Sequence, residues 1–300
     1  MKPSLSREAG TGLRIYATGK KGLSCLQGAV SSHGPQIIAG VLIGKDPNVL
    51  DDFSTAILEY CNLQKIPTAV FPSLLNSPFL MAIAAGWQRL IHDVPAEKLI
   101  VFHDSLLPKY RGFNPLVTAV LNQDSTVGVT ALRGEARYDE GDIYLQKSVA
   151  VKYPTTIEKV IEDVASLYAI LAAEIAMRIV AQTLTAKSQD ENKATYSLWR
   201  DEEDYRIDWC QDAKKIEHFV TCVGFPYKGA SFIAKGNLYR LSAATAVDDV
   251  QIINRTPGKI IYFVENKPVV VCGRGLLRLD AFQDDTTGSE KNLTLRTRIT

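Results

Sequence analysis

The sequence predicts an α/β protein in which a mostly parallel sheet with covering helices is followed by a smaller domain of antiparallel strands. Short apolar runs alternate with helical stretches in the first half, and short strands separated by turns follow residue 229. A polar stretch without apolar periodicity lies between these two patterns, at residues 186–197. With 300 residues, of which 46% are hydrophobic, the chain is long enough for about two domains with separate cores.

The first half of the sequence has the pattern of repeated strand–helix–strand units. Strands are expected at residues 13–19, 36–44, 66–71, within 79–91, at 99–102 and at 128–132, and helices at 22–34, 51–62 and 155–184. Units of this kind build a parallel sheet. Ligands of such sheets bind outside the carboxyl ends of the strands, which directs attention to the residues that follow each strand.

The second half of the sequence has a different pattern of helix and strand signals. One helix is expected at 212–224, followed by strands at 230–234, 238–243, 258–263, 267–273 and 276–282, with a turn at Gly236-Asn237. Many short strands at this spacing indicate a small antiparallel barrel. We therefore expect a catalytic domain at 1–185, a linker at 186–197 and a β domain at 198–300.

Composition and charge exclude several classes of function. The net charge is +1, so nothing in it favours a nucleic acid or an anionic membrane as partner. The apolar stretches are shorter than a membrane span, and residues 1–12 lack the apolar core of a signal peptide. Five dispersed cysteines, without metal-ligand or disulfide spacing, suggest reduced thiols, a cytoplasmic protein and no metal site.

The candidate chemistry lies where strands end. His103 directly follows the apolar run 99–102, and the turn "YDEGDI" at 138–143 carries Asp139, Glu140 and Asp142. A carboxylate beside an imidazole fixes its tautomer and suits the removal of a proton from an attacking amine. From residue types alone, a structural histidine and a solvated acidic loop are the commoner explanation of such a pattern.

The order of these motifs is more specific. "HDSLLPKYRG" at 103–112, followed by "VGVT" at 127–130 and "DEGDI" at 139–143, resembles the folate-dependent formyltransferase family. Residues 206–236 and 256–279 resemble the C-terminal barrel of its methionyl-tRNA and amino-sugar members. The resemblance implies a Rossmann-like formyltransferase fold with an OB-like β domain.

The resemblance also implies a reaction, the transfer of a formyl group from 10-formyltetrahydrofolate to a primary amine. His103 and Asp142 match the catalytic His and Asp of the family, but Val101 stands where the family has an Asn that donates to the formyl oxygen. Loss of one such donor costs roughly 2.7–4 kcal/mol in other enzymes. Gln88, Asn114 or a protonated His103 are candidates to replace it, and an altered reaction stays open.

Binding residues follow from the same resemblance. The folate is expected to contact Trp87, Gln88, Arg89, Leu90, Ser105, Leu106, Leu107, Pro108, Tyr138, Asp139, Glu140 and Gly141. The acceptor is expected to contact Lys109, Tyr110, Arg111 and Asn114, whose cations suit an anionic group such as a phosphate.

The acceptor is predicted from the loop that follows the second strand. The tRNA-modifying members carry a long basic loop where this chain has the short acidic stretch "GKDPNVLDDF" at 44–53. We therefore expect a small amine, above all a nucleotide-linked amino sugar, and neither tRNA nor a membrane as partner. Three alternatives stay open: a formyl-folate hydrolase, a folate-binding protein without transfer activity, and a methionyl-tRNA formyltransferase. A homodimer is also kept open.

Overall fold

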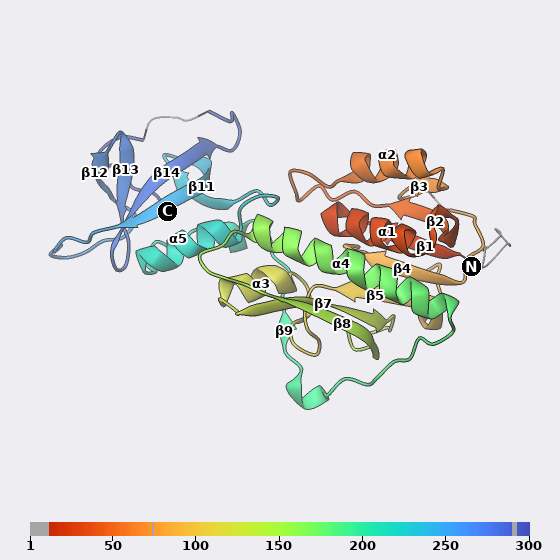
Figure 1. Cartoon of the computed structure of the whole chain (residues 1–300). Coiled ribbons are helices and arrows are strands. Elements are labelled where there is room, and N and C mark those ends of the chain that lie inside the picture. The colour runs from red at the N-terminus through yellow and green to blue at the C-terminus, as the bar shows by residue number, and fades with distance from the viewer. Residues whose placement is uncertain (1–11, 74, 290–292) are drawn as a thin grey trace. The chain divides into compact units, whose positions relative to one another are not determined.

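The computed structural model describes residues 12–73, 75–289 and 293–300, which form two compact units (Figure 1). The first unit comprises residues 12–119, 124–152 and 159–199, and the second comprises 120–123, 153–158 and 200–300. The stretch expected to be a linker, 186–197, thus belongs to the first unit.

The described part of the first unit contains a seven-stranded sheet in the order β3-β2-β1-β4-β5-β7-β8. Its parallel strands are β1 (Leu13–Ala17), β2 (Ile38–Ile43), β3 (Thr68–Val70), β4 (Met81–Ala85) and β5 (Leu99–His103). Strands β7 (Thr126–Arg133) and β8 (Ile143–Ala150) continue the sheet in antiparallel pairing, β7 with β5 and β8 with β7. The mostly parallel sheet is confirmed, and β8 is an addition to the expected strands.

Helices α1 (Gly19–His33) and α4 (Ile157–Val180) run along one face of this sheet, and α2 (Ser54–Gln64) lies beside α1 (Figure 1). The predicted apolar face of α4 is largely buried, and Tyr168 packs against Phe102 of β5. A Cβ at Gly28 of α1 would lie 2.1 Å from the backbone oxygen of Ala169, so only glycine allows α1 and α4 to approach this closely.

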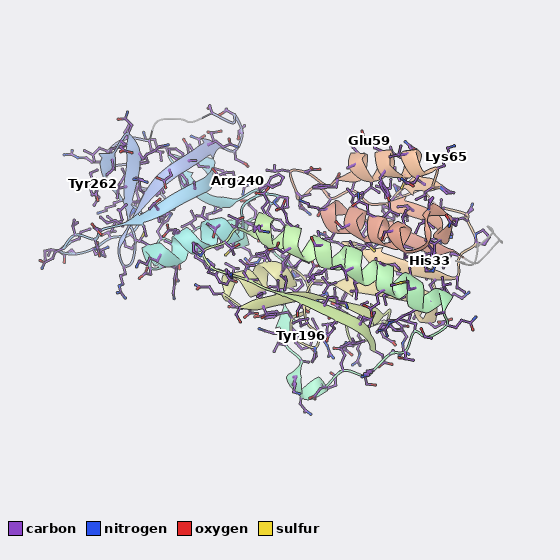
Figure 2. All side chains as sticks on the ribbon, viewed as in Figure 1. His33, Glu59, Lys65, Tyr196, Arg240 and Tyr262 are labelled. Atoms are coloured by element: carbon purple, nitrogen blue, oxygen red, sulfur yellow. The ribbon has the colours of Figure 1, made fainter. Side chains whose placement is uncertain are left out.

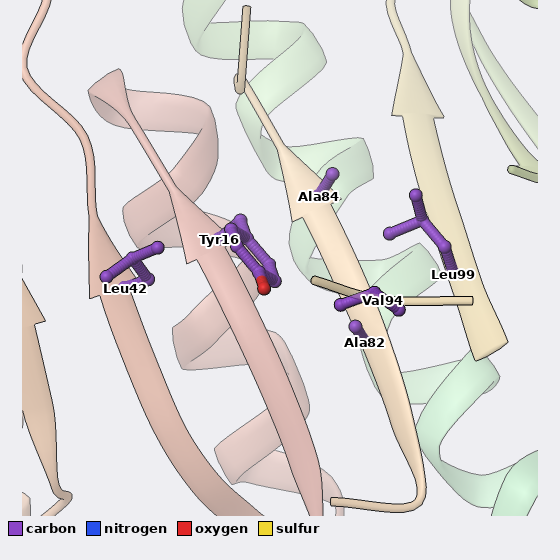
Figure 3. Close-up of a cluster of buried hydrophobic side chains, with 6 residues drawn as sticks. All are labelled: Tyr16, Leu42, Ala82, Ala84, Val94 and Leu99. Carbon is purple, nitrogen blue, oxygen red and sulfur yellow. The ribbon is translucent and has the colours of Figure 1, made fainter. Parts of the chain in front are cut away.

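The opposite face carries an apolar cluster that reaches the candidate site. Its buried members, shown in Figure 3, are Tyr16, Leu42, Ala82, Ala84, Val94 and Leu99. Trp87, Ile91 and Val101 pack against them. Since side chains alternate along a strand, Leu99, Val101 and His103 of β5 share this face.

Shorter elements complete the first unit. Strand β6 (Arg111–Gly112) pairs in parallel with β9 (Tyr196–Ser197), and α3 (Pro115–Leu121) follows β6. One-turn 3₁₀ helices span Pro35–Ile37, Ala96–Lys98 and Glu191–Lys193 in this unit, and Glu203–Tyr205 in the second unit.

The second unit contains α5 (Ala213–Cys222) and, in its described part, a five-stranded antiparallel sheet. The strand order is β10 (Ala230–Ala234), β11 (Asn237–Val247), β14 (Leu276–Asp284), β13 (Lys267–Val271) and β12 (Ile260–Val264). Residues 297–300 join its two edges, because Ile233 N donates to Thr300 O and Ile260 N donates to Thr297 O. The buried Arg240 of β11 (Figure 2) bonds Glu202 and Asp285.

The turn between β10 and β11 lies one residue earlier than expected. Lys235 and Gly236 have φ values of 50° and 81°, and Ala234 stands opposite Asn237 in the ladder. Two successive residues with positive φ match the twist of a tight hairpin, so Asn237 begins the next strand instead of forming the turn.

None of the described helices is long and apolar enough to span a membrane.

Candidate functional site

His103 lies at the carboxyl end of β5, where the sheet changes from parallel to antiparallel pairing. Its side chain is 8% exposed and stands opposite Thr130 of β7 in the ladder. The strand therefore delivers an imidazole to the edge of the sheet at which ligands of α/β proteins bind.

Both ring nitrogens of His103 have partners. Nε2 lies 2.7 Å from the backbone oxygen of Tyr110, and Nδ1 lies 3.4 Å from Oδ1 of Asp139. A carbonyl oxygen only accepts, so Nε2 carries a hydrogen and donates it. Nδ1 is then the nitrogen that faces the carboxylate, and the tautomer is set by the backbone.

Asp139 is held in place by a second bond. Its Oδ2 accepts a hydrogen bond of 2.9 Å from the backbone N–H of Gly112, and its side chain is 12% exposed. Asp139 also has a φ of 58°, a left-handed conformation that Asp tolerates better than most residues. The carboxylate is thus fixed between the imidazole and the backbone of β6.

Asp142, expected to be the partner of His103, contacts a different side chain. Its Oδ2 lies 3.2 Å from Nη2 of Arg133, and its backbone oxygen accepts from Arg133 N. The chain passes Arg133 so closely at Gly141 that a Cβ there would lie 1.9 Å from the Arg133 oxygen. This contact lies at the start of the β7–β8 ladder. The carboxylate that faces His103 therefore belongs to Asp139, three residues before the expected Asp142.

The turn at 105–108 is fixed by two residues that the sequence did not single out. Thr130 Oγ1 donates to Ser105 O and accepts from Leu107 N, at 2.6 and 3.1 Å. Gln146 Nε2 donates to both Leu107 O and Thr130 Oγ1 at 2.9 Å. A threonine within the apolar run 127–132 of β7 was the available signal for this network.

The loop after β4 carries the other residues expected to bind folate. Trp87 packs edge-on against Tyr16 and Phe71, with ring centroids 5.2 and 5.7 Å apart. Gln88 Nε2 donates to Asp46 Oδ2 at 3.0 Å, and Arg89 Nη2 donates to Lys45 O at 2.9 Å. Leu90 is exposed. The loop is thus tied to the acidic stretch 44–53.

The residue two positions before the histidine has apolar neighbours. Val101 packs against the cluster shown in Figure 3, together with Trp87 and Ile91. Among the candidate replacement donors, Gln88 bonds Asp46 and His103 bonds Tyr110 O, while Asn114 has a φ of 47°. Two of the three candidates thus already donate to the protein.

Arg111 differs most from its expected role. Its side chain is completely buried, and it donates to Gln189 Oε1 and to both carboxylate oxygens of Glu191. The hydrogen bond with Glu191 raises the pKa of the guanidinium further. Arg111 is therefore part of the scaffold and is left out of the acceptor site. Lys109 lies at the surface, 2.6 Å from Asp124.

A second polar group holds the end of β5 from the side of α1 and α4. Asp104 forms an ion pair with Lys21 of α1 and accepts from Tyr168 Oη at 2.5 Å. Tyr168 Oη also lies 3.1 Å from Phe102 O. Burial, reinforced by Asp104, raises the pKa of Tyr168 well above its ordinary value. In the described ranges, no three His, Cys, Asp or Glu side chains gather as a metal-binding set.

Two family models match the chain, "Formyl transferase" at residues 76–174 and "Formyl transferase, C-terminal domain" at 200–290. A methionyl-tRNA formyltransferase of Methylococcus capsulatus is 32% identical over 205 residues, covering 67% of this chain and 65% of the relative. One from Roseiflexus sp. is 30% identical over 220 residues, covering 72% of this chain and 67% of the relative. The chain thus spans about two thirds of the length of these relatives.

Among solved structures, an N-formyltransferase from Helicobacter canadensis, in complex with folinic acid and dTDP-3-aminofucose, has a similar fold. The TM-score is 0.63 at 16% identity, covering 89% of this chain and 98% of that one. At this identity the likeness concerns the fold.

Proposed function

The chain belongs to the formyl transferase family, and we propose that it transfers a formyl group from 10-formyltetrahydrofolate to a primary amine. The observation that carries the proposal is the contact between His103 and Asp139, 3.4 Å apart at the carboxyl end of β5. Bound formyl-folate supplies an activated formyl carbon.

The His103–Asp139 pair is suited to accept the proton that the attacking amine must lose. As the new C–N bond forms and the bond to the folate nitrogen breaks, one proton leaves the amine and one is needed by the folate nitrogen. Asp139 would accept the proton of the amine, share it with His103 Nδ1 and return it to the leaving folate nitrogen, while Tyr110 O and Gly112 N hold both groups in place. The backbone partners keep the pair oriented through the transfer.

Two unpartnered atoms support a polar ligand above the ends of β1 and β4. Thr18 Oγ1 and Trp87 Nε1 are buried, and neither has a hydrogen-bond partner in the described chain. Both side chains border Gly44, where a Cβ would lie 2.2 Å from Thr18 Oγ1 and 2.8 Å from Trp87 Cζ3. Buried polar atoms are normally satisfied, so a bound folate offering hydrogen-bonding groups here fits the residues present.

For the acceptor we propose a nucleotide-linked amino sugar. The stretch 44–53 carries Asp46, Asp51 and Asp52, and the net charge of the chain is +1. Both features oppose the multiple phosphate contacts on which tRNA affinity depends. The Helicobacter canadensis protein of similar fold was solved with an amino sugar linked to dTDP. The methionyl-tRNA formyltransferases similar in sequence support tRNA as the competing acceptor.

A second candidate function rests on Val101. Because no amide stands at this position, a site that binds formyl-folate and releases formate to water is the alternative to transfer. The two reactions differ in their need for an amine, which makes them separable in one assay.

The test offers the protein 10-formyltetrahydrofolate with a panel of nucleotide-linked amino sugars, with methionyl-tRNA, or with buffer alone. We expect amine-dependent formation of tetrahydrofolate with at least one sugar. Efficient formylation of the tRNA, with a steep dependence on salt, would overturn the acceptor. Formate release that is independent of any amine would replace transfer by hydrolysis.

A further inference from the structure

The segment 186–197 runs along both turns that hold the partners of His103. Thr195 N donates to Pro108 O, Arg111 N donates to Thr195 O and Phe113 N donates to Ser197 O. These bonds, with the β6–β9 pair, fasten the turn that contributes Tyr110 O to the imidazole. Tyr196 of β9, labelled in Figure 2, is exposed.

Gln189 makes the corresponding bonds to the acidic turn. Its Nε2 donates to the backbone oxygens of Asp139 and Gly141, both at 2.7 Å. Its Oε1 accepts from Nε and Nη2 of the buried Arg111, at 3.1 and 2.9 Å. One side-chain amide thus links the turn that carries the carboxylate to the residue that follows Tyr110.

We propose that Gln189 is a positioning residue that holds the 139–141 turn so that Asp139 faces His103. The inference rests on the proposed function, because the geometry it maintains is that of the proposed proton-transfer pair. Asp139 has a left-handed backbone, and the two carbonyls bonded by Gln189 lie on either side of Glu140. Without these two hydrogen bonds, the turn is no longer held in a backbone conformation that most residues avoid.

An amide is the side chain that meets both demands. Two N–H groups are needed for the two carbonyls, and an oxygen is needed for the guanidinium. Glutamate at this position would keep the acceptor for Arg111 and lose both donors. Gln189→Glu therefore separates the link to the acidic turn from the anchoring of Arg111.

The matched control is Glu191→Gln, which removes the charge from the other partner of Arg111 and leaves the Gln189 bonds to the turn. We expect Gln189→Glu to lower kcat by about tenfold to hundredfold, the effect of a misplaced catalytic group, with little change in KM for the folate. Glu191→Gln should change kcat by less than about threefold.

A measurement independent of turnover is the ring-carbon NMR signal of His103, one of four histidines. It should move in Gln189→Glu and stay in place in Glu191→Gln. Unchanged kcat together with an unmoved His103 signal in Gln189→Glu would overturn the inference. If Gln189→Glu does not fold, Gln189→Leu is the substitute, with the same expected loss.

Failure of the proposed function is distinguishable from failure of this inference. Absence of transfer and hydrolysis by the native protein would remove the reaction, whereas the NMR comparison would still report whether Gln189 holds Asp139 against His103.

Discussion

Asp139 Oδ1 faces His103 Nδ1 at 3.4 Å, while Asp142, in the same turn, lies 3.2 Å from Arg133. Two carboxylates three residues apart are thereby assigned to different partners. The difference has a direct consequence for mutagenesis.

Asp139→Asn should lower formyl transfer by about a hundredfold or more, because a positioned acid–base group contributes of that order. Asp142→Asn is the matched control. It removes a partly exposed ion pair and should cost less than about threefold. Steady-state rates of the two variants make the comparison, and a larger loss in Asp142→Asn would reverse the assignment. A double variant of His103 and Asp139 should lose little more than either single one, because the pair acts as a unit.

Val101→Asn tests whether the site lacks only a donor. We expect a gain in transfer of less than about tenfold, which is about 1.4 kcal/mol of barrier, because the surrounding wall is apolar. An unpaired buried amide costs about 1–3 kcal/mol, so the variant should also be less stable. Val101→Leu provides the control for side-chain size. A hundredfold gain would identify the native protein as a formyltransferase weakened at this one position.

Arg111→Met should reduce the free energy of unfolding by about 2–4 kcal/mol, because it leaves Gln189 Oε1 without its donors inside the protein. Lys109→Met, in the same turn, removes an exposed pair with Asp124 and should cost less than about 1 kcal/mol. Chemical denaturation measures both values. Equal losses would show that the buried guanidinium is no more important than its exposed neighbour.

Stability should fall at alkaline pH through two buried tyrosines. Burial raises the pKa of Tyr16 to about 12, and burial together with Asp104 raises that of Tyr168 well above its ordinary value. A raised folded-state pKa adds stability that is fully present below the unfolded value of about 10 and is lost as the pH rises through the folded value. Tyr168→Phe loses the hydrogen bonds to Phe102 O and Asp104, so it should be less stable at neutral pH. It should also lose stability less steeply above a pH of about 10. Parallel alkaline curves for the native protein and the variant would contradict this coupling.

The sequence predicted the elements whose signals are local. The apolar runs of β1, β2 and β5 and the long apolar face of α4 are strong patterns, and each lies close to its expected place. Strand β8 was missed because Gln146, Lys147 and Ser148 interrupt its apolar residues. An antiparallel edge strand buries only one face, so it lacks the continuous apolar run expected of a parallel one.

The sequence predicted correctly which turn supplies the carboxylate that contacts His103. Within that turn, however, a different carboxylate makes the contact. Three carboxylates within 139–142 have similar sequence contexts, and the contacts that distinguish them, from Gly112 to Asp139 and from Arg133 to Asp142, are made by residues distant in sequence. Arg111 had the appearance of a surface cation because its partners, Gln189 and Glu191, lie about eighty residues away in sequence. Contacts of this range leave no periodic trace in the chain.

The bonds made by residues 189–197 limit how this protein can be dissected or recombined. A fragment that stops at residue 185, after the last long helix that covers the sheet, would lack Gln189, Thr195 and Ser197. Both turns around His103 would then lose the hydrogen bonds that hold them in place. The same holds for a chimaera that exchanges this segment as if it were a neutral spacer. A cut between Trp199 and Arg200 keeps the segment with the sheet it supports.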